Sequence, residues 1–259
     1  MFGIVPRVVW EKLHPPDNKN RIRLALGVLL VKAHGRNILV DTGIGNKGDV
    51  KFCERFAVDR TPSIEQSLAK NHLTPNDIQI VINTHLHLDH AGGNTRKDSQ
   101  DRILPTFPKA KYYIQRREWE SALHPDERTQ GSYRQEDFII LKEKGQIEFL
   151  EGDARILEGI GVIETPGHTE HHQSALVKSE GKSALFLGDF IPTVSHIPYP
   201  YIMGYDVFPL TTLATKKRIL AQAYEEHWLL IFQHDPMLRM GYLKEIKGQF
   251  VVEEVVQET

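Results

Sequence analysis

Short apolar runs alternate with amphipathic or polar segments along this chain. The runs Leu24 to Lys32 and Asn37 to Val40 predict a β-hairpin. Thr212 to Glu226 has the apolar spacing of an amphipathic helix. Pro62 to Asn71 predicts a shorter helix with Thr61 as its cap. Further strands are expected at Ile78 to Asn83, Lys111 to Ile114, Ile147 to Leu150, Gly161 to Glu164, Gln173 to Lys178, Ser183 to Leu187 and Trp228 to Phe232.

Helices interleaved with many strands predict packed α/β layers. No internal repeat or flexible linker interrupts the pattern, so residues 1–259 are predicted to form a single domain. A charged, partly helical excursion at about residues 115–145 carries Trp119, Tyr133 and Phe138. We expect this excursion to lie near a pocket, although surface helices carry aromatic residues for packing as well.

Polar residues able to bind a metal stand where several of the apolar runs end. Open α/β sheets bind their ligands at the carboxyl ends of their strands, so such residues can meet at one rim. Five separate strand ends deliver one each: Asp41, His85, His168, Asp189 and His234.

The densest cluster lies in the run from Thr84 to His90, where positions 85–90 hold four ligand-type side chains in six positions. In an extended segment, residues i and i+2 point the same way, so His85 and His87 can hold one metal together. Asp89 and His90 follow as the chain turns, and Gly92-Gly93 then lets the backbone bend away. Histidine nitrogen and carboxylate oxygen without thiolate suit zinc, with iron or manganese as substitutes. The alternative is a loop of solvated histidines.

This run resembles the HxHxDH signature of the metallo-β-lactamase superfamily. The other motifs of that family follow in the same order: Asp41-Thr42-Gly43, Thr165-Pro166-Gly167-His168-Thr169, Leu187-Gly188-Asp189 and Gln233-His234-Asp235. The resemblance extends over roughly residues 24–235, and the motifs are specific jointly rather than singly.

The resemblance implies an αββα four-layer sandwich and two divalent metal ions per chain. The residues it assigns to the first metal are His85, His87 and His168. Those it assigns to the second are Asp89, His90 and His234, with Asp189 as the bridge between the two metals. Asp41 is expected to orient a ligand rather than bind a metal, unless it is only a turn residue before Gly43.

Such a site predicts hydrolysis. Two metals about 3.5–4 Å apart can share a bridging water and lower its pKa, so that a hydroxide attacks the substrate. Asp89 is the expected catalytic residue, which takes the proton and passes it to the leaving group. No serine or cysteine nucleophile is needed.

The substrate is less well defined by the sequence. Pro192 to Pro209 is the expected pocket wall, with candidate substrate contacts at His196, Tyr199, Tyr201 and Tyr205. Whether His171 or His172 reaches the site stays open. The motifs resemble the lactonase, glyoxalase II and phosphotriesterase-like branches. Lactonases often carry a tyrosine three residues after the bridging Asp, where this chain has Pro192.

We therefore expect a hydrolase that cleaves a lactone or another small carboxylic ester. The alternatives are a phosphodiesterase or phosphotriesterase and a thioesterase of the glyoxalase II type. A mono-iron sulfur dioxygenase needs fewer ligands, and a non-catalytic binding protein would have lost ligands that this chain keeps.

Charge and cysteine content limit the classes of binding partner and the compartment that we expect for this protein. A net charge of −2 provides no basic footprint for nucleic acid. The apolar run Ala25 to Val31 is too short to span a bilayer, and Met1 to Pro16 lacks a signal-peptide pattern. The one cysteine, Cys53, excludes an intrachain disulfide and fits a cytoplasmic location. We expect a small-molecule substrate, and the sequence is compatible with a homo-oligomer.

Overall fold

The computed structural model describes residues 1–255 of the 259-residue chain. These residues divide into two compact units. The middle unit is Val28–Glu151, and the terminal unit combines Met1–Gly27 with the described residues from Gly152 onward. That the chain forms a single domain stays a prediction.

The middle unit contains a five-stranded sheet in the order β1-β2-β3-β6-β7. The pair β1–β2 is antiparallel, and the other pairs are parallel. The strands are β1 (Leu29–Ala33), β2 (Arg36–Val40), β3 (Ile80–Ile82), β6 (Lys111–Gln115) and β7 (Ile147–Leu150), with a separate small sheet of β4 (Thr95–Lys97) and β5 (Ile103–Pro105).

The predicted hairpin is confirmed, but its first strand begins at Leu29 rather than Leu24. The residues just before it belong to the terminal unit and bond elsewhere. Ala25 N donates to His234 O at 2.9 Å, and Gly27 N donates to Gln233 O at 3.0 Å. A continuous apolar run therefore serves two different partners, which its hydropathy alone does not reveal.

Helices and short 3₁₀ turns connect the strands of the middle unit. They are α2 (Val50–Phe56), α3 (Ile64–Ala69), η1 (Pro75–Asp77), α4 (Leu88–Ala91), η2 (Gly92–Asn94), α5 (Arg116–Leu123), η3 (Gln135–Asp137) and α6 (Ile139–Glu143). The prediction that Thr61 caps the helix was wrong. Ser63 caps α3, because its side chain and that of Gln66 form a reciprocal capping box.

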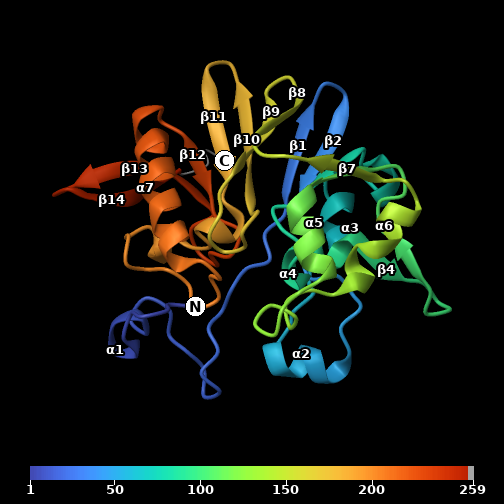
Figure 1. The fold of residues 1–259 in the computed structure, drawn as a ribbon, viewed down its shortest axis with the longest axis horizontal. Helices are drawn as coiled ribbons and strands as arrows, with labels where there is room; N and C mark the ends of the chain where they lie inside the picture. Colours follow the sequence, from blue (N-terminus) through green and yellow to red (C-terminus); the bar gives the residue numbers. More distant parts are fainter. Residues whose placement is uncertain (256–259) are drawn as a thin grey trace. The chain divides into compact units, whose positions relative to one another are not determined.

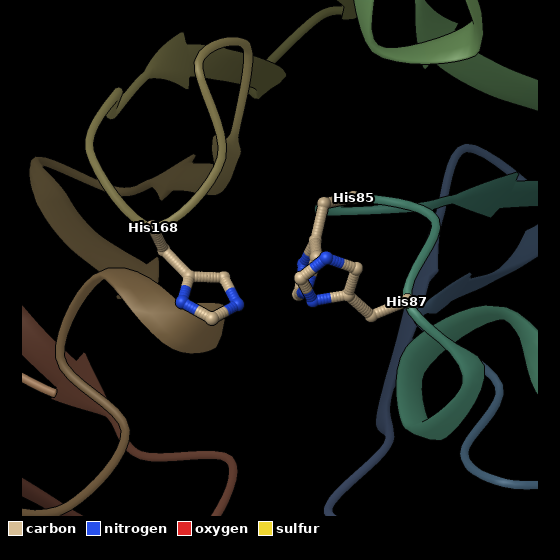
Figure 2. A group of neighbouring side chains, drawn as sticks. All are labelled: His85, His87 and His168. Atoms are coloured by element: carbon tan, nitrogen blue, oxygen red, sulfur yellow. The ribbon is translucent and has the colours of Figure 1, made fainter. Parts of the chain in front are cut away.

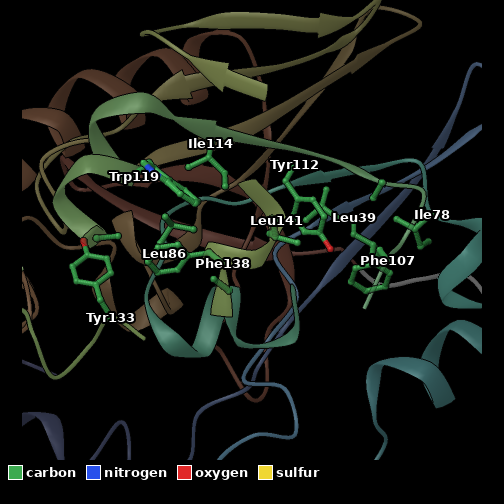
Figure 3. Close-up of a cluster of buried hydrophobic side chains, with 14 of the residues drawn as sticks. Leu39, Ile78, Leu86, Phe107, Tyr112, Ile114, Trp119, Tyr133, Phe138 and Leu141 are labelled. Carbon is green, nitrogen blue, oxygen red and sulfur yellow. The ribbon is translucent and has the colours of Figure 1, made fainter. Parts of the chain in front are cut away.

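The excursion at residues 115–145 forms part of the core of the middle unit. Trp119, Tyr133 and Phe138 are at most 9% exposed and pack with Leu86 and Tyr112 (Figure 3). Their aromatic surface therefore stabilises the fold.

The terminal unit contains a seven-stranded sheet in the order β14-β13-β12-β11-β10-β9-β8. All neighbours pair antiparallel except β11 and β12, which are parallel. The strands are β8 (Ala154–Leu157), β9 (Ile160–Glu164), β10 (Gln173–Ser179), β11 (Lys182–Phe186), β12 (Leu229–Ile231), β13 (Met240–Ile246) and β14 (Gln249–Glu254).

The main helix of the terminal unit is α7 (Pro209–Glu225), which lies beside β13 in Figure 1. It begins three residues before the predicted start, since Pro209 takes the first helical position. Its Ile219, Leu220 and Ala223 are buried in a core with Trp228 and Leu230. This unit also contains α1 (Arg7–Trp10), η4 (Gly188–Phe190) and η5 (Val194–His196). Among residues 1–255, no helix has both the length and the apolar character that crossing a membrane requires.

Candidate metal centre

Four of the predicted ligands lie on one loop of the middle unit, directly after β3. His87 precedes α4, and Asp89 and His90 lie within that single helical turn. The ring centroids of His85 and His87 are 4.4 Å apart, and those of His85 and His90 are 4.0 Å apart. Figure 2 shows the His85 and His87 imidazoles next to one another on this loop. The predicted i, i+2 pairing is therefore present within this unit.

Asp41 lies at the end of β2 and holds both ends of the ligand loop. Its carboxylate accepts hydrogen bonds from Thr84 N at 2.7 Å, Thr84 Oγ1 at 2.8 Å and His90 Nδ1 at 2.9 Å. The side chain is fully buried, and its φ of 58° lies in the left-handed region that aspartate tolerates. Within the middle unit, Asp41 therefore fixes the orientation of His90, a predicted ligand, and its role beside a metal stays a prediction.

The hydrogen bonds of Thr84 determine which nitrogen of His85 is available. The Thr84 hydroxyl donates its one proton to Asp41, so at 3.0 Å it accepts from His85 Nδ1. His90 Nδ1 is held by Asp41 in turn. In both histidines Nδ1 is thereby engaged, which leaves Nε2 as the atom that would bind a metal, as is usual in metal sites.

Gly92 and Gly93 are needed for close packing rather than for the predicted sharp bend. A Cβ on Gly92 would collide with the carbonyl oxygen of Ile44, and one on Gly93 with that of Thr42. Gly92 itself has an ordinary helical backbone with a φ of −57°. The two glycines thus let the loop after Asp41 lie against the end of the ligand loop.

A buried lysine also holds the segment that follows the ligand loop. Lys47 Nζ donates to the carbonyl oxygens of Gly92 and, at 2.7 Å, Thr95, and it lies 3.0 Å from Asp137 Oδ1. Burial lowers the pKa of Lys47 and raises that of Asp137. The pair has almost no exposed surface, so removing one partner would leave a buried, uncompensated charge.

The other three predicted ligands lie in the terminal unit and meet at Asp189. Its Oδ2 is 3.1 Å from His168 Nε2, and its Oδ1 is 2.9 Å from His234 Nε2. His168 lies on the loop after β9 (Figure 2), Asp189 in η4 after β11, and His234 after β12. One carboxylate therefore has one imidazole at each of its two oxygens, which suits a carboxylate that bridges two metal ions.

The second nitrogen of each of these histidines is held by the protein. His168 Nδ1 lies 3.0 Å from Asp206 Oδ1, and Asp206 also accepts from Thr212 Oγ1 at 2.8 Å. His234 Nδ1 donates to Ala25 O at 2.6 Å. Sequence reasoning did not identify Asp206, since nothing in its local sequence distinguishes it from an ordinary loop aspartate.

The turn that carries Asp189 is fixed by His172. Asp189 N donates to His172 Nε2 at 3.2 Å, and His172 Nδ1 lies 2.7 Å from Thr165 Oγ1. Because Nε2 accepts, Nδ1 carries the proton. Thr165 then donates to Ser174 Oγ at 2.9 Å, and Ser174 to Leu187 O at 3.2 Å. The question of the two histidines is thus answered in part: His172 supports a predicted ligand, while His171 lies 3.8 Å from Glu164 and Glu170.

The candidate substrate contacts differ in their surroundings. His196 is 1% exposed and stacks on Phe2, with ring centroids 4.7 Å apart, and burial lowers its pKa to about 3. Tyr201 is half-buried and meets Phe2 edge-on. Tyr199 and Tyr205 are 36% and 63% exposed. His196 has the environment of a packing residue, and substrate contact by any of the four stays a prediction.

The sequence missed one more supporting group, Glu118. It is a buried glutamate on α5 with the charged residues Arg116, Arg117 and Glu120 close by in the sequence, so from sequence alone it resembles part of a solvated helix face. The donors present in the two units are imidazole nitrogens and carboxylate oxygens, most of them buried and held through a second atom. This donor set fits zinc and chemically similar divalent ions.

Comparison with known proteins agrees with these motifs. A model of the metallo-beta-lactamase superfamily matches residues 28–234. The N-acyl homoserine lactonase AiiA of Bacillus thuringiensis subsp. kurstaki is 28% identical over 227 residues, covering 83% of this chain and 82% of that protein. A probable metal-dependent hydrolase from Staphylococcus aureus is 28% identical with a TM-score of 0.91, covering 100% of this chain and 91% of its own. An N-acyl homoserine lactone hydrolase, with N-hexanoyl-L-homoserine bound at its catalytic metal centre, is 26% identical with a TM-score of 0.63, covering 82% of each chain.

Proposed function

Because this chain belongs to the metallo-β-lactamase superfamily, we propose that it is a dinuclear metal-dependent hydrolase that opens a lactone or another small carboxylic ester. The observation that carries the proposal is the complete ligand set on that family's motifs. The comparisons support the substrate class, since N-acyl homoserine lactonases of Bacillus match most of the chain.

The proposed metal ligands are the seven residues that the family motifs single out. For the first metal they are His85, His87 and His168, for the second Asp89, His90 and His234, and for both Asp189. We propose zinc, with iron or manganese as substitutes.

Two bound divalent ions would supply Lewis acidity, which lowers the pKa of a water and polarises the substrate carbonyl. The chain's own residues do the rest. Asp189 keeps the two imidazoles of the terminal unit at one carboxylate, and Asp41 keeps His90 in one orientation. Asp89 has a side chain 34% exposed, so it can exchange a proton with solvent or with a leaving alkoxide.

The lactonase tyrosine has no direct replacement at Pro192. Pro192 instead supports the proposed ligand His234, because the Pro192 carbonyl oxygen accepts a hydrogen bond from His234 N at 3.0 Å. Tyr199, Tyr201 and Tyr205 lie further along the same segment, and we propose that this segment forms the acyl side of the pocket. We further propose a small-molecule substrate rather than nucleic acid, a cytoplasmic location and a chain able to form homo-oligomers.

The test is a substrate panel on zinc-loaded protein, with Asp189→Ala as the control for contaminating activity. The panel contains lactones of several acyl lengths, a thioester, a phosphotriester, a phosphodiester and RNA. We expect the highest kcat/KM on a lactone or simple ester, and close to two metal equivalents per chain by elemental analysis. A preference for the phosphodiester of about 100-fold, which is about 2.7 kcal/mol in transition-state binding, would overturn the ester proposal.

A further inference from the structure

Glu118 is a carboxylate buried inside the middle unit, outside the predicted ligand set. It lies in the first turn of α5 and is 1% exposed, whereas Arg116, Arg117 and Glu120 on the same helix are exposed. Removing a carboxylate from water is costly unless hydrogen bonds compensate. The contacts of Glu118 therefore indicate what this side chain does.

Two donors converge on its Oε1 atom. Leu86 N donates at 3.0 Å, and the Tyr133 hydroxyl donates at 3.0 Å. Leu86 is the residue between His85 and His87, and its own side chain is fully buried in the core. The carboxylate thus holds the peptide group that joins two proposed metal ligands.

Tyr133 strengthens this hold from the other side. Its backbone forms an isolated antiparallel bridge with His87, and its ring meets the His87 imidazole edge-on at 4.7 Å. Next to it, Leu88 N donates to Ser132 O at 2.9 Å. Burial and the nearby Glu118 carboxylate raise the pKa of the Tyr133 phenol, so it keeps its proton and remains a donor.

The ligand loop is consequently held at both ends and in its middle. Asp41 binds Thr84 and His90, while Glu118 binds the amide of Leu86. In an extended segment, fixing the central amide also fixes the direction in which its two neighbours point.

We propose that Glu118 is a positioning residue for the ligand pair His85 and His87, and that it acts through the Leu86 amide. The inference rests on the proposed function in one respect, that these two histidines bind metal. Reach rather than charge is the property required, because an amide oxygen in the same place can accept the Leu86 N–H as well.

The experiment compares four variants by zinc affinity in chelator competition, without any substrate. Glu118→Gln keeps the reach of the side chain, and we expect its affinity to stay within about threefold of wild type. Glu118→Asp keeps the charge but is shorter by one carbon–carbon bond, about 1.5 Å. We expect it, like Glu118→Ala, to lose about 10–100-fold in affinity for one zinc, as partners of metal ligands do. Glu120→Ala on the exposed side of α5 should match wild type.

Circular dichroism on the metal-free variants shows whether each is folded. If Glu118→Ala fails to fold, the Gln and Asp variants decide the matter. Wild-type zinc affinity in folded Glu118→Asp, or a loss in Glu118→Gln as large as in Glu118→Asp, would overturn the positioning role. Because no substrate is involved, an incorrect ester proposal would leave these affinities unchanged.

Discussion

The two units carry their predicted metal ligands on different kinds of backbone. The middle unit places four on one continuous loop after β3, whereas the terminal unit gathers three from the ends of β9, β11 and β12. In the middle unit, two buried carboxylates, Asp41 and Glu118, hold the backbone of the loop. In the terminal unit, Asp189 is placed by uncharged groups, through the relay of His172, Thr165 and Ser174.

The two units thus hold their predicted ligands in fixed orientations in two different ways. A continuous loop has its spacing set by the chain, so a few contacts to its backbone fix several ligands together. Ligands from separate strands share no local backbone, so each needs a partner of its own. His168 has Asp206, His234 has Ala25 O, and the Asp189 turn has His172. Substituting a supporting residue should therefore disturb several predicted ligands in the middle unit but only one in the terminal unit.

The largest expected effect comes from Asp189, which contacts the predicted ligands His168 and His234 within the terminal unit. Asp189→Ala should lower kcat/KM by at least about 1,000-fold, beyond the 10–100-fold typical of groups that only orient a ligand. It should also reduce the bound metal measured by elemental analysis. The exposed Glu253→Ala is a control in the same unit. Wild-type rate and metal content in Asp189→Ala would exclude a bridging role.

A smaller effect should distinguish the two orienting carboxylates. Asp41→Ala removes an acceptor for three donors on the ligand loop, whereas Asp206→Ala removes one for His168 and Thr212. Both should weaken zinc binding by about 10–100-fold, with Asp41→Ala nearer the upper end. Chelator competition measures this, with the exposed Asp101→Ala as the control. A stronger loss in Asp206→Ala would contradict the contrast between the units.

The sequence predicted the candidate ligands of the site but not the residues that support them. The run from His85 to His90 could be singled out in the sequence because its predicted ligands lie close together along the chain, and Asp41 because it ends a strand. Their supports, Glu118 and Asp206, are single acidic residues far away in sequence, and only the tertiary structure brings them close to the ligands within their own units. A lone charged residue resembles a solvated one until its burial is known.

The sequence also predicted some elements of the fold better than others. Strands that pair only within the sheet of the middle unit, such as β2 and β3, lie close to their predicted positions. The run beginning at Leu24 was wrong at its start, because residues 25–27 bond with residues 233–234. The aromatic residues at 119, 133 and 138 fill a core, and whether their segment also lies near a pocket stays a prediction. Hydropathy records that a side chain is apolar but not which surface it covers.

The smallest expected effect concerns acid stability and separates packing from substrate contact at His196. Burial lowers the pKa of this histidine from 6.5 to about 3. Between these values the unfolded chain binds one more proton than the folded one, so this residue makes the protein less stable as pH falls below about 6.5. The contribution to the slope approaches about 1.4 kcal/mol per pH unit for one full proton.

His196→Phe retains a ring to stack on Phe2 but cannot titrate, so it should flatten the acid dependence of the unfolding free energy by up to one proton. Denaturant unfolding of metal-free protein between pH 4 and 6 measures the slope, whatever the absolute stability of the variant. Thr193→Val removes the hydroxyl 2.7 Å from His196 Nδ1 but leaves the buried ring, so it should keep the wild-type slope. If His196→Phe also kept that slope, His196 would be open to solvent protons, and a role in contacting substrate would regain support over packing against Phe2.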